Sequence, residues 1–406
     1  MESLITSTTG ILTVLCGIAA IFFLLEKRTK WKLFNYFPPL IFIYCIPAML
    51  SNIPIGENSF ILPRTSGVYT MLKEIVLPMF LVIMLLKVDV VSTVKVMGRG
   101  VFVMLMGTAG VVIGAPLAYL LVRNHLPPET WKAFGTLAGS WIGGTGNMAA
   151  VADGLEVGNS PQFGLAILGD NVVYLVWLPI LLASKCIAKP FHRFVKIDHH
   201  RLEILESVKN APDEKTEPVA MRHFLYLFAI GFACIWIANT ISPGLADFIS
   251  RTVPKLKVVL TASSCKILLI TTMGLLLSCT PAKKIPASHE LAMALVYIFV
   301  ANMGAKADLS QLDASAGWFI LACFVWISIH GAFCLLGAYL FKVDIHSTAI
   351  ASAANIGGAA SAPIVAAYHN EKLVPVSILM ALIGYAVGNY AAFFAAWLCR
   401  LVSTQI

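Results

Sequence analysis

Two glycine pairs interrupt apolar segments in the two halves of the chain, and each is followed by a polar side chain at the same spacing. Asn147 lies three residues beyond Gly143-Gly144, and Ser361 lies three residues beyond Gly357-Gly358. Glycine weakens a helix, and at membrane depth the freed backbone groups need partners in protein or in a water-filled cavity. Exposed helix ends attract anions at their N–H groups and Na⁺ at their carbonyls. These four glycines and Pro363, which lacks a backbone donor, are the predicted helix breaks.

Asp170 is the strongest candidate for an ionisable group at membrane depth. It lies centrally in the apolar segment Pro161–Ala183, precedes Asn171 and has no basic neighbour in the sequence. Such groups are costly in a membrane and are functional candidates by default. We predict that Asp170 binds Na⁺ or carries a proton; a buried acid paired with a distant lysine is the alternative. The full set of predicted ion ligands is Asp170, Asn147, Asn171, Gly144, Gly146 and Gly358.

Polar residues in the two motifs and in the last apolar segment are candidates for solute binding. They are Thr145, Asn355, Ser361, Asn389 and Tyr390. Hydrogen bonding between helices explains Asn171 and Asn389 equally well. Close helix packing by small residues is likewise the alternative for either glycine motif taken alone.

The composition indicates the class of protein that must position these residues. Of 406 residues, 58% are hydrophobic and 12% are charged, and the mean hydropathy is +0.83. Soluble domains average about 25% charged residues, so the chain is expected to be a multi-pass membrane protein. The net charge of +8 comes from basic residues at loop ends, which suits lipid headgroups rather than nucleic acid. The nine cysteines are scattered singly, so no zinc site is expected.

Twelve apolar segments are candidate membrane helices, and we predict an all-α protein with about 10–12 transmembrane helices. In the first half they are Thr9–Leu25, Phe37–Leu50, Val68–Leu86, Val101–Val122, Thr130–Ala152 and Pro161–Ala183. In the second half they are Phe224–Ile241, Val258–Cys279, His289–Met303, Trp318–Leu340, Ser347–Ala367 and Val376–Leu401. We interpret Lys73 as an interfacial residue near the end of its segment. Asp153 and Glu156, which follow the first interrupted segment, are interpreted as loop residues.

Short matches between the halves indicate an internal repeat. Lys87-Val88-Asp89-Val90 matches Lys306-Ala307-Asp308-Leu309 at a displacement of 219 residues, and the glycine motifs match at 214. Ala118-Tyr119-Leu120 also recurs, at 220. The repeats are expected to cover residues 1–184 and 223–406, with a polar linker at 185–222. We favour inverted repeats, although six full crossings per half would make them parallel, and the positive-inside rule does not decide the orientation.

The two motif regions and Gly169-Asp170-Asn171 resemble the YjcL-like family of uncharacterised bacterial membrane proteins over nearly the whole chain. That family is grouped with the cation:proton antiporter and anion transporter superfamily, which includes bile acid:sodium and glutamate:sodium symporters. The resemblance implies a panel domain (about residues 9–86 and 224–303) and a core domain (about 101–183 and 318–401). In the core, two discontinuous helices would cross, and the core would move against the panel. It does not supply a substrate.

The sequence therefore predicts a secondary active transporter, coupled to Na⁺ or H⁺, for a small anionic or zwitterionic organic solute. Anionic groups would face helix N-termini near Asn355 and Ser361. The expected partners are the solute and the lipid bilayer of the bacterial inner membrane, with a homodimer left open. No cofactor is expected beyond a bound Na⁺. The alternatives are a cation:proton antiporter without an organic substrate, a channel-like protein, and a membrane enzyme, for which no catalytic cluster is found.

Overall fold

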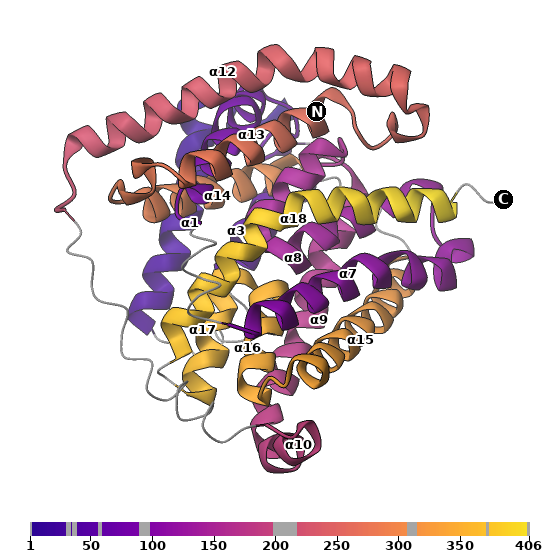
Figure 1. Ribbon diagram of the computed structural model, residues 1–406. Helices are drawn as coiled ribbons and strands as arrows, with labels where there is room; N and C mark the ends of the chain where they lie inside the picture. Colours follow the sequence, from indigo (N-terminus) through magenta and orange to yellow (C-terminus); the bar gives the residue numbers. More distant parts are fainter. Residues whose placement is uncertain are drawn as a thin grey trace.

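The computed structural model (Figure 1) describes residues 2–29, 34, 39–55, 59–88, 98–197, 217–306, 315–370 and 373–403. Among these residues, each predicted apolar segment contains a helix. The first half contains α1 (Thr8–Thr29), α3 (Pro39–Asn52), α4 (Gly67–Met71), the π-helix η1 (Leu72–Val76), α5 (Leu77–Leu85), α7 (Gly100–Val122), α8 (Trp131–Gly154) and α9 (Pro161–Ala183). The second half contains α12 (Met221–Thr252), α13 (Ala262–Ser278), α14 (Ser288–Lys306), α15 (Ser315–Phe341), α16 (Ile345–Ile356), α17 (Gly358–His369) and α18 (Val374–Ser403).

Short elements connect these helices. They are β1 (Glu2–Ser3), which pairs in parallel with β2 (Ser59–Phe60), and η2 (Arg123–His125), η3 (Pro128–Thr130), η4 (Ser184–Ile187), α10 (Ala188–Val195), η5 (Pro254–Leu256) and η6 (Pro281–Lys284). Several helix starts have the side-chain cap that their sequence favours. Asp344, for example, accepts a 2.8 Å hydrogen bond from the Ser347 amide at the start of α16, which satisfies one of the unpaired N–H groups there.

The protein is a multi-pass membrane protein. Within the described residues, eight helical spans are long and apolar enough to cross a membrane, and α3 and α13 add two shorter apolar helices. The long helix α12 lies along the top of Figure 1. Its Trp236 is 71% exposed, as expected of a side chain that faces lipid rather than a protein core.

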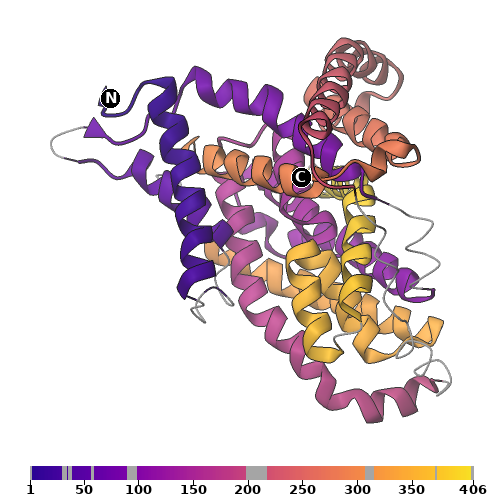
Figure 2. The same ribbon diagram turned by 90° about the vertical axis from the view of Figure 1, so that its left-hand side faces the viewer.

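The long helices pack in two groups that meet along one interface. The α14 group comprises α1, α3, η1, α5, α12, α13 and α14, and the α9 group comprises α7, α8, α9, α15, α16, α17 and α18. Helices α5, α13 and α14 of the first group contact α8 of the second. In Figure 2, α1 (indigo) lies at the left, away from α16–α18 (orange to yellow). Residues on both sides of the interface belong to one continuous apolar core.

Helix α8 reverses direction at its glycine pair. A Cβ atom on Gly139 would lie 3.0 Å from the Asn147 carbonyl oxygen, and one on Gly135 would lie 2.9 Å from Leu155 Cδ1. In a straight helix, residues eight apart are separated by about 12 Å. Gly144, at φ 72° and ψ −175°, makes the turn.

Helices α16 and α17 form a second hairpin. The Nδ1 atoms of His346 and His369, at its two ends, are 2.8 Å apart, whereas a straight helix would separate these residues by about 35 Å. Both predicted segments are discontinuous, but each folds back as a hairpin at its break instead of continuing in one direction. The predicted break at Pro363 is wrong. Helix α17 continues through Pro363, because neighbouring helices in a membrane protein can satisfy the backbone group that a helical proline frees.

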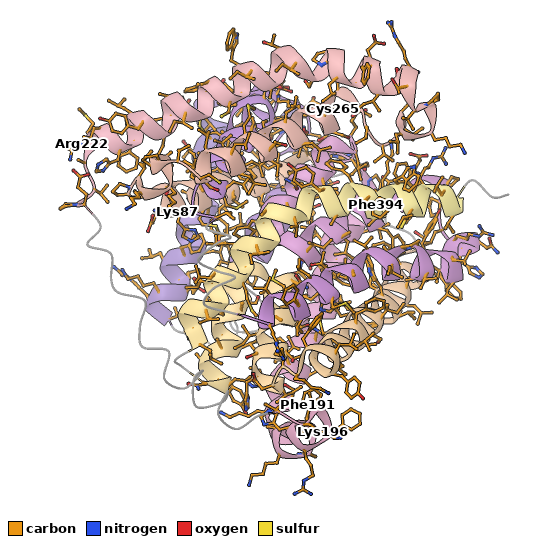
Figure 3. The ribbon with its side chains drawn as sticks, viewed as in Figure 1. Lys87, Phe191, Lys196, Arg222, Cys265 and Phe394 are labelled. Atoms are coloured by element: carbon orange, nitrogen blue, oxygen red, sulfur yellow. The ribbon has the colours of Figure 1, made fainter. Side chains whose placement is uncertain are left out.

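The linker is partly helical. Helix α9 (magenta in Figure 2) continues through η4 into α10, which projects from the end of the molecule, and Figure 3 shows Phe191 and Lys196 on this projection. Residues 198–216 of the linker, and the landmarks Asp89 and Asp308, lie outside the described residues.

Candidate functional site at the tips of two hairpins

The tips of the two hairpins touch. A Cβ atom on Gly144 would lie 3.7 Å from the Cα of Gly358, and one on Gly358 would lie 3.5 Å from the Cα of Gly144. Gly358 has φ 58°, so both tips use the left-handed half of backbone space that favours glycine. The two motifs predicted from sequence are thus adjacent in space.

The hairpins approach from opposite ends of α9. Gly154, at the base of the α8 hairpin, precedes the N-terminus of α9 at Pro161. The base of the other hairpin lies at the C-terminus of α9, where His369 Nε2 is 2.9 Å from the Leu181 carbonyl oxygen. Since α9 is about 35 Å long, close to the thickness of a bilayer's hydrocarbon core, the tips meet near its middle.

A cavity of about 440 Å³ lies where the tips meet, between the two helix groups. From the α14 group it is lined by Phe23 and Glu26 of α1, Pro39 of α3, Met84 of α5 and His289, Met293, Val296 and Tyr297 of α14, with Phe34 beside them. From the α9 group it is lined by Ser140, Gly144, Thr145, Gly146, Asp170, Asn171, Tyr174, Ile356, Gly357, Ser361, Ile364 and Tyr385. The second arm of α8 and helix α17 both begin at this cavity, so two helix N-termini direct N–H groups toward it.

Asp170 is held by two neutral donors from α8. Ser140 Oγ donates to Asp170 Oδ2 at 2.9 Å, and Trp141 Nε1 donates to Asp170 Oδ1 at 3.0 Å. The Trp141 ring is itself fixed against Trp326, with centroids 4.5 Å apart. The carboxylate is thus oriented at the wall of the cavity with lone pairs left over for a further ligand.

Trp141→Phe is expected to weaken cation binding about 10- to 150-fold, because a hydrogen bond to a charged group contributes about 1.5–3 kcal/mol. The cation-dependent shift of the unfolding midpoint measures this effect. Trp326→Phe is the matched control, since its indole donates instead to the Val111 carbonyl oxygen at 2.7 Å. Equal losses of cation affinity in the two variants would contradict a positioning role for Trp141.

The structure brings seven of the residues singled out in the sequence to the cavity wall. They are Gly144, Thr145, Gly146, Asp170, Asn171, Gly357 and Ser361. Asn171 Nδ2 donates to the Ile167 carbonyl oxygen within its own helix at 2.8 Å. Tyr174 and Ser361 flank Gly357, where a Cβ atom would contact both side chains.

Five of the predicted ion and solute ligands do not line the cavity. Gly358 lies at the tip of its hairpin, against Gly144, and the other four take part in contacts between helices. Asn147 Nδ2 donates to the Tyr385 carbonyl oxygen at 3.2 Å, and Asn355 Nδ2 donates to the Met104 carbonyl oxygen at 2.9 Å. Asn389 Nδ2 donates to Thr271 at 2.8 Å, and the Tyr390 hydroxyl is 2.7 Å from that of Thr272. The last two join α18 to α13, as the packing alternative for Asn389 proposed.

A second, smaller cavity of about 90 Å³ lies along the same interface, near the base of the α8 hairpin. Lys73 Nζ of η1 and Asp153 Oδ1 of α8 form a 3.0 Å ion pair across it. Asp153 is largely buried and belongs to α8, so its interpretation as a loop residue is wrong. The neighbouring Glu74 pairs with Lys266 of α13 at 2.6 Å, within the α14 group. Lys73–Asp153 is thus a charged contact between the two groups.

A thin apolar layer separates the two cavities. Phe80 of α5 and Phe299 of α14 have ring centroids 6.0 Å apart. A Cβ atom on Gly146 would lie 3.3 Å from Met84 Cε and 3.5 Å from Phe80 Cε2. Because α14 contributes Val296 and Tyr297 to the large cavity and Phe299 to the small one, about one helical turn divides them.

Several lining residues were not among the predicted site residues. They are Ser140, Tyr174, Tyr385, Glu26, His289 and Tyr297. The repeat gives a signal for one of them, because Tyr385 lies 215 residues after Asp170, close to the 214-residue displacement of the two glycine motifs. Glu26, His289 and Tyr297 reach the cavity through packing of the α14 group, and Ser140 and Tyr174 lie on α8 and α9. No local sequence motif marks these five residues as lining residues.

Comparison with known proteins gives two matches. The family model described as "Protein of unknown function (DUF819)" matches residues 13–401. The chain is also similar to "Uncharacterized membrane protein YjcL" of Bacillus subtilis (strain 168), with 26% identity over 354 residues that cover 85% of this chain and 87% of that protein. The region that the family model matches includes both hairpins and Asp170.

Proposed function

The chain belongs to the DUF819 family of proteins of unknown function, and from that premise we propose that it is a secondary active transporter for a small organic solute, coupled to Na⁺ or H⁺. The observation that carries this proposal is the large cavity. It joins two touching helix breaks and an acid that has no ion-pair partner among the described residues. Paired helix breaks near mid-membrane are the features from which transporters build solute and ion sites.

The two cavities support a mechanism of alternating access. The large cavity is the solute site, and the small cavity with Lys73–Asp153 is the closed path to the other face of the membrane. Sliding the α9 group along the α14 group would carry the hairpin tips past the Phe80–Phe299 layer. In this proposal the α14 group is the panel, the α9 group is the core, and the cation sits at Asp170.

Counting crossings supports inverted repeats. If the hairpins enter and leave on one side, each half has five crossing helices: α1, α3, α5, α7 and α9, then α12, α13, α14, α15 and α18. Five is odd, so equivalent helices of the two halves run in opposite directions. This count removes the difficulty that six crossings per half posed, and it favours membership of the cation:proton antiporter and anion transporter superfamily.

Neutralising Lys73–Asp153 is expected to open the closed path more often. In the double variant Lys73→Met/Asp153→Leu, removing both charges avoids leaving one buried charge unpaired. We expect a cysteine at Thr145 to react about three to ten times faster with a charged maleimide from the side of the α8 base, since a shift of about 1 kcal/mol changes populations by that order.

Lys266→Met/Glu74→Gln is the matched control, because that pair joins α13 to η1 inside the α14 group. A rate increase as large in the control as in the Lys73 variant would contradict the proposed gate. Unchanged rates in both variants would contradict it as well.

Three alternatives have distinct outcomes in proteoliposomes. A cation:proton antiporter would move protons against Na⁺ with no organic solute, and a channel would show currents in bilayers. An enzyme would turn over a solute without gradient-driven accumulation. A thermal-shift screen of solutes in NaCl against KCl tests the main proposal, because a ligand whose stabilisation rises or falls with one cation identifies both the solute and the coupling cation. The inner membrane of a bacterium is the proposed location, and a homodimer stays a prediction.

A further inference from the structure

Asp170 needs a positive partner that the described part of the chain does not provide. Ser140 and Trp141 orient the carboxylate, but neutral donors do not cancel its charge. An ionised carboxylate removed from water must be paired with a cation or take up a proton. The partner therefore arrives through the cavity.

The rest of the cavity wall has the wrong charge for a simple anion. Its described lining contains a second acid, Glu26, and no lysine or arginine. Two helix N-termini contribute partial positive charge near Thr145 and Ser361. A solute with only negative charge would thus meet two carboxylates and no compensating side-chain cation.

The size and surface of the cavity point to a solute larger than a metal ion. About 440 Å³ is room for more than ten water molecules, at about 30 Å³ each. Tyr174, Tyr297 and Tyr385 place aromatic rings on its walls, with the thioethers of Met84 and Met293 beside them. Aromatic faces attract organic cations, and thioethers adapt to apolar groups.

We propose that the transported solute carries a positively charged nitrogen on an apolar or aromatic body, and that this charge takes the place of the coupling cation on Asp170. The inference rests on the proposed transport function. One positive charge leaves the carboxylate as another arrives, so the charge balance at the site is unchanged. When the coupling cation is H⁺, the carboxyl proton departs as the ammonium binds. Solute and cation then move in opposite directions.

Few other groups can titrate beside Asp170. Tyr174 lies on the same helix, Cys323 of α15 faces the carboxyl group, and Glu26 and His289 lie across the cavity. A zwitterion also fits this arrangement, because its carboxylate can reach the helix N-termini at the hairpin tips while its ammonium lies on Asp170.

Three probes with the same phenyl ring test the inference on the purified full-length chain. Phenethylamine has only the ammonium, phenylalanine has both charges, and 3-phenylpropionate has only the carboxylate. We expect the first two to raise the unfolding midpoint and the third to leave it unchanged. The apparent affinity for phenethylamine should fall about tenfold for each tenfold rise of the coupling cation above its own dissociation constant, as competition for one site requires.

Asp170→Asn should abolish stabilisation by phenethylamine, whereas Asp247→Asn should preserve it. Asp247 is the matched control because its carboxylate is exposed on α12 and pairs with Arg251. The wild-type competition decides the question even if Asp170→Asn does not fold. Stabilisation by 3-phenylpropionate alone, or phenethylamine binding indifferent to both Na⁺ and pH, would overturn the inference while leaving transport intact. Failure of the transport proposal would be detected separately: a cysteine at Thr145 would then be labelled from one face of the membrane only.

Discussion

Asp170→Asn is expected to weaken binding of the coupling cation by about 30- to 5,000-fold, because removing one partner of a buried charge pair costs about 2–5 kcal/mol. The amide has nearly the shape of the carboxylate. Its oxygen can still accept from Trp141 Nε1, and its NH2 group can donate to the Ser140 hydroxyl, which donated to the carboxylate before, so the fold should persist. The measurement is the shift of the unfolding midpoint caused by NaCl against KCl and by pH, together with radioactive sodium or proton flux into proteoliposomes.

The same shift should appear in Asp247→Asn as in the wild type, since that carboxylate lies on exposed α12. A wild-type response of Asp170→Asn to both Na⁺ and pH, in flux and in stability, would contradict a role of Asp170 in ion binding. Asp170 would then be a structural acid held by α8.

Gly144→Ala is expected to lower transport by about 100-fold, the order of loss that misplacing a site by about 1 Å can produce. The backbone at φ 72° and ψ −175° lies in a region that is nearly exclusive to glycine and costs other residues about 1–3 kcal/mol. Space is not the obstacle, because a Cβ atom would lie 3.4 Å from Tyr385 Cε1. The tip must instead change its conformation and shift Thr145 and Gly146.

Gly17→Ala is the matched control, because it is the same glycine-to-alanine substitution away from the hairpin tips. Gly17 lies within α1 and a Cβ atom there would meet nothing within 4 Å, so the substitution should leave transport unchanged and slightly favour the helix. Uptake and the unfolding midpoint are measured for both variants. Full transport by Gly144→Ala would show that the tip conformation has no part in the site.

The helical segments could be predicted from the sequence because an apolar run of membrane length has few other outcomes. Thr9–Leu25, for example, corresponds to α1 and Trp318–Leu340 to α15. The two glycine motifs also marked the breaks. Their shape could not be predicted, because a glycine pair permits a kink and a reversal alike. Packing decides between them: both arms of α8 lie against each other and against α18.

The part of the candidate site that could be predicted is Asp170, because packing alone rarely explains a carboxylate inside a membrane segment. Asn147, Asn355 and Asn389 were less informative, because an amide inside a helix bundle serves equally well as a hydrogen-bonding partner of the next helix. The ion pair Lys73–Asp153 could not be predicted from the sequence. Its two residues are 80 positions apart, and only the contact of η1 with the α8 base brings them together.

Accessibility of Thr145 tests the central claim most directly. A cysteine at Thr145, in a background without the exposed Cys16, Cys186 and Cys279, is exposed to a charged, membrane-impermeant maleimide in right-side-out and in inside-out vesicles. A transporter with alternating access predicts labelling above the parent background from each face, with opposite changes at the two faces when the coupling cation is added. Labelling from one face only, under every ionic condition, would contradict the account.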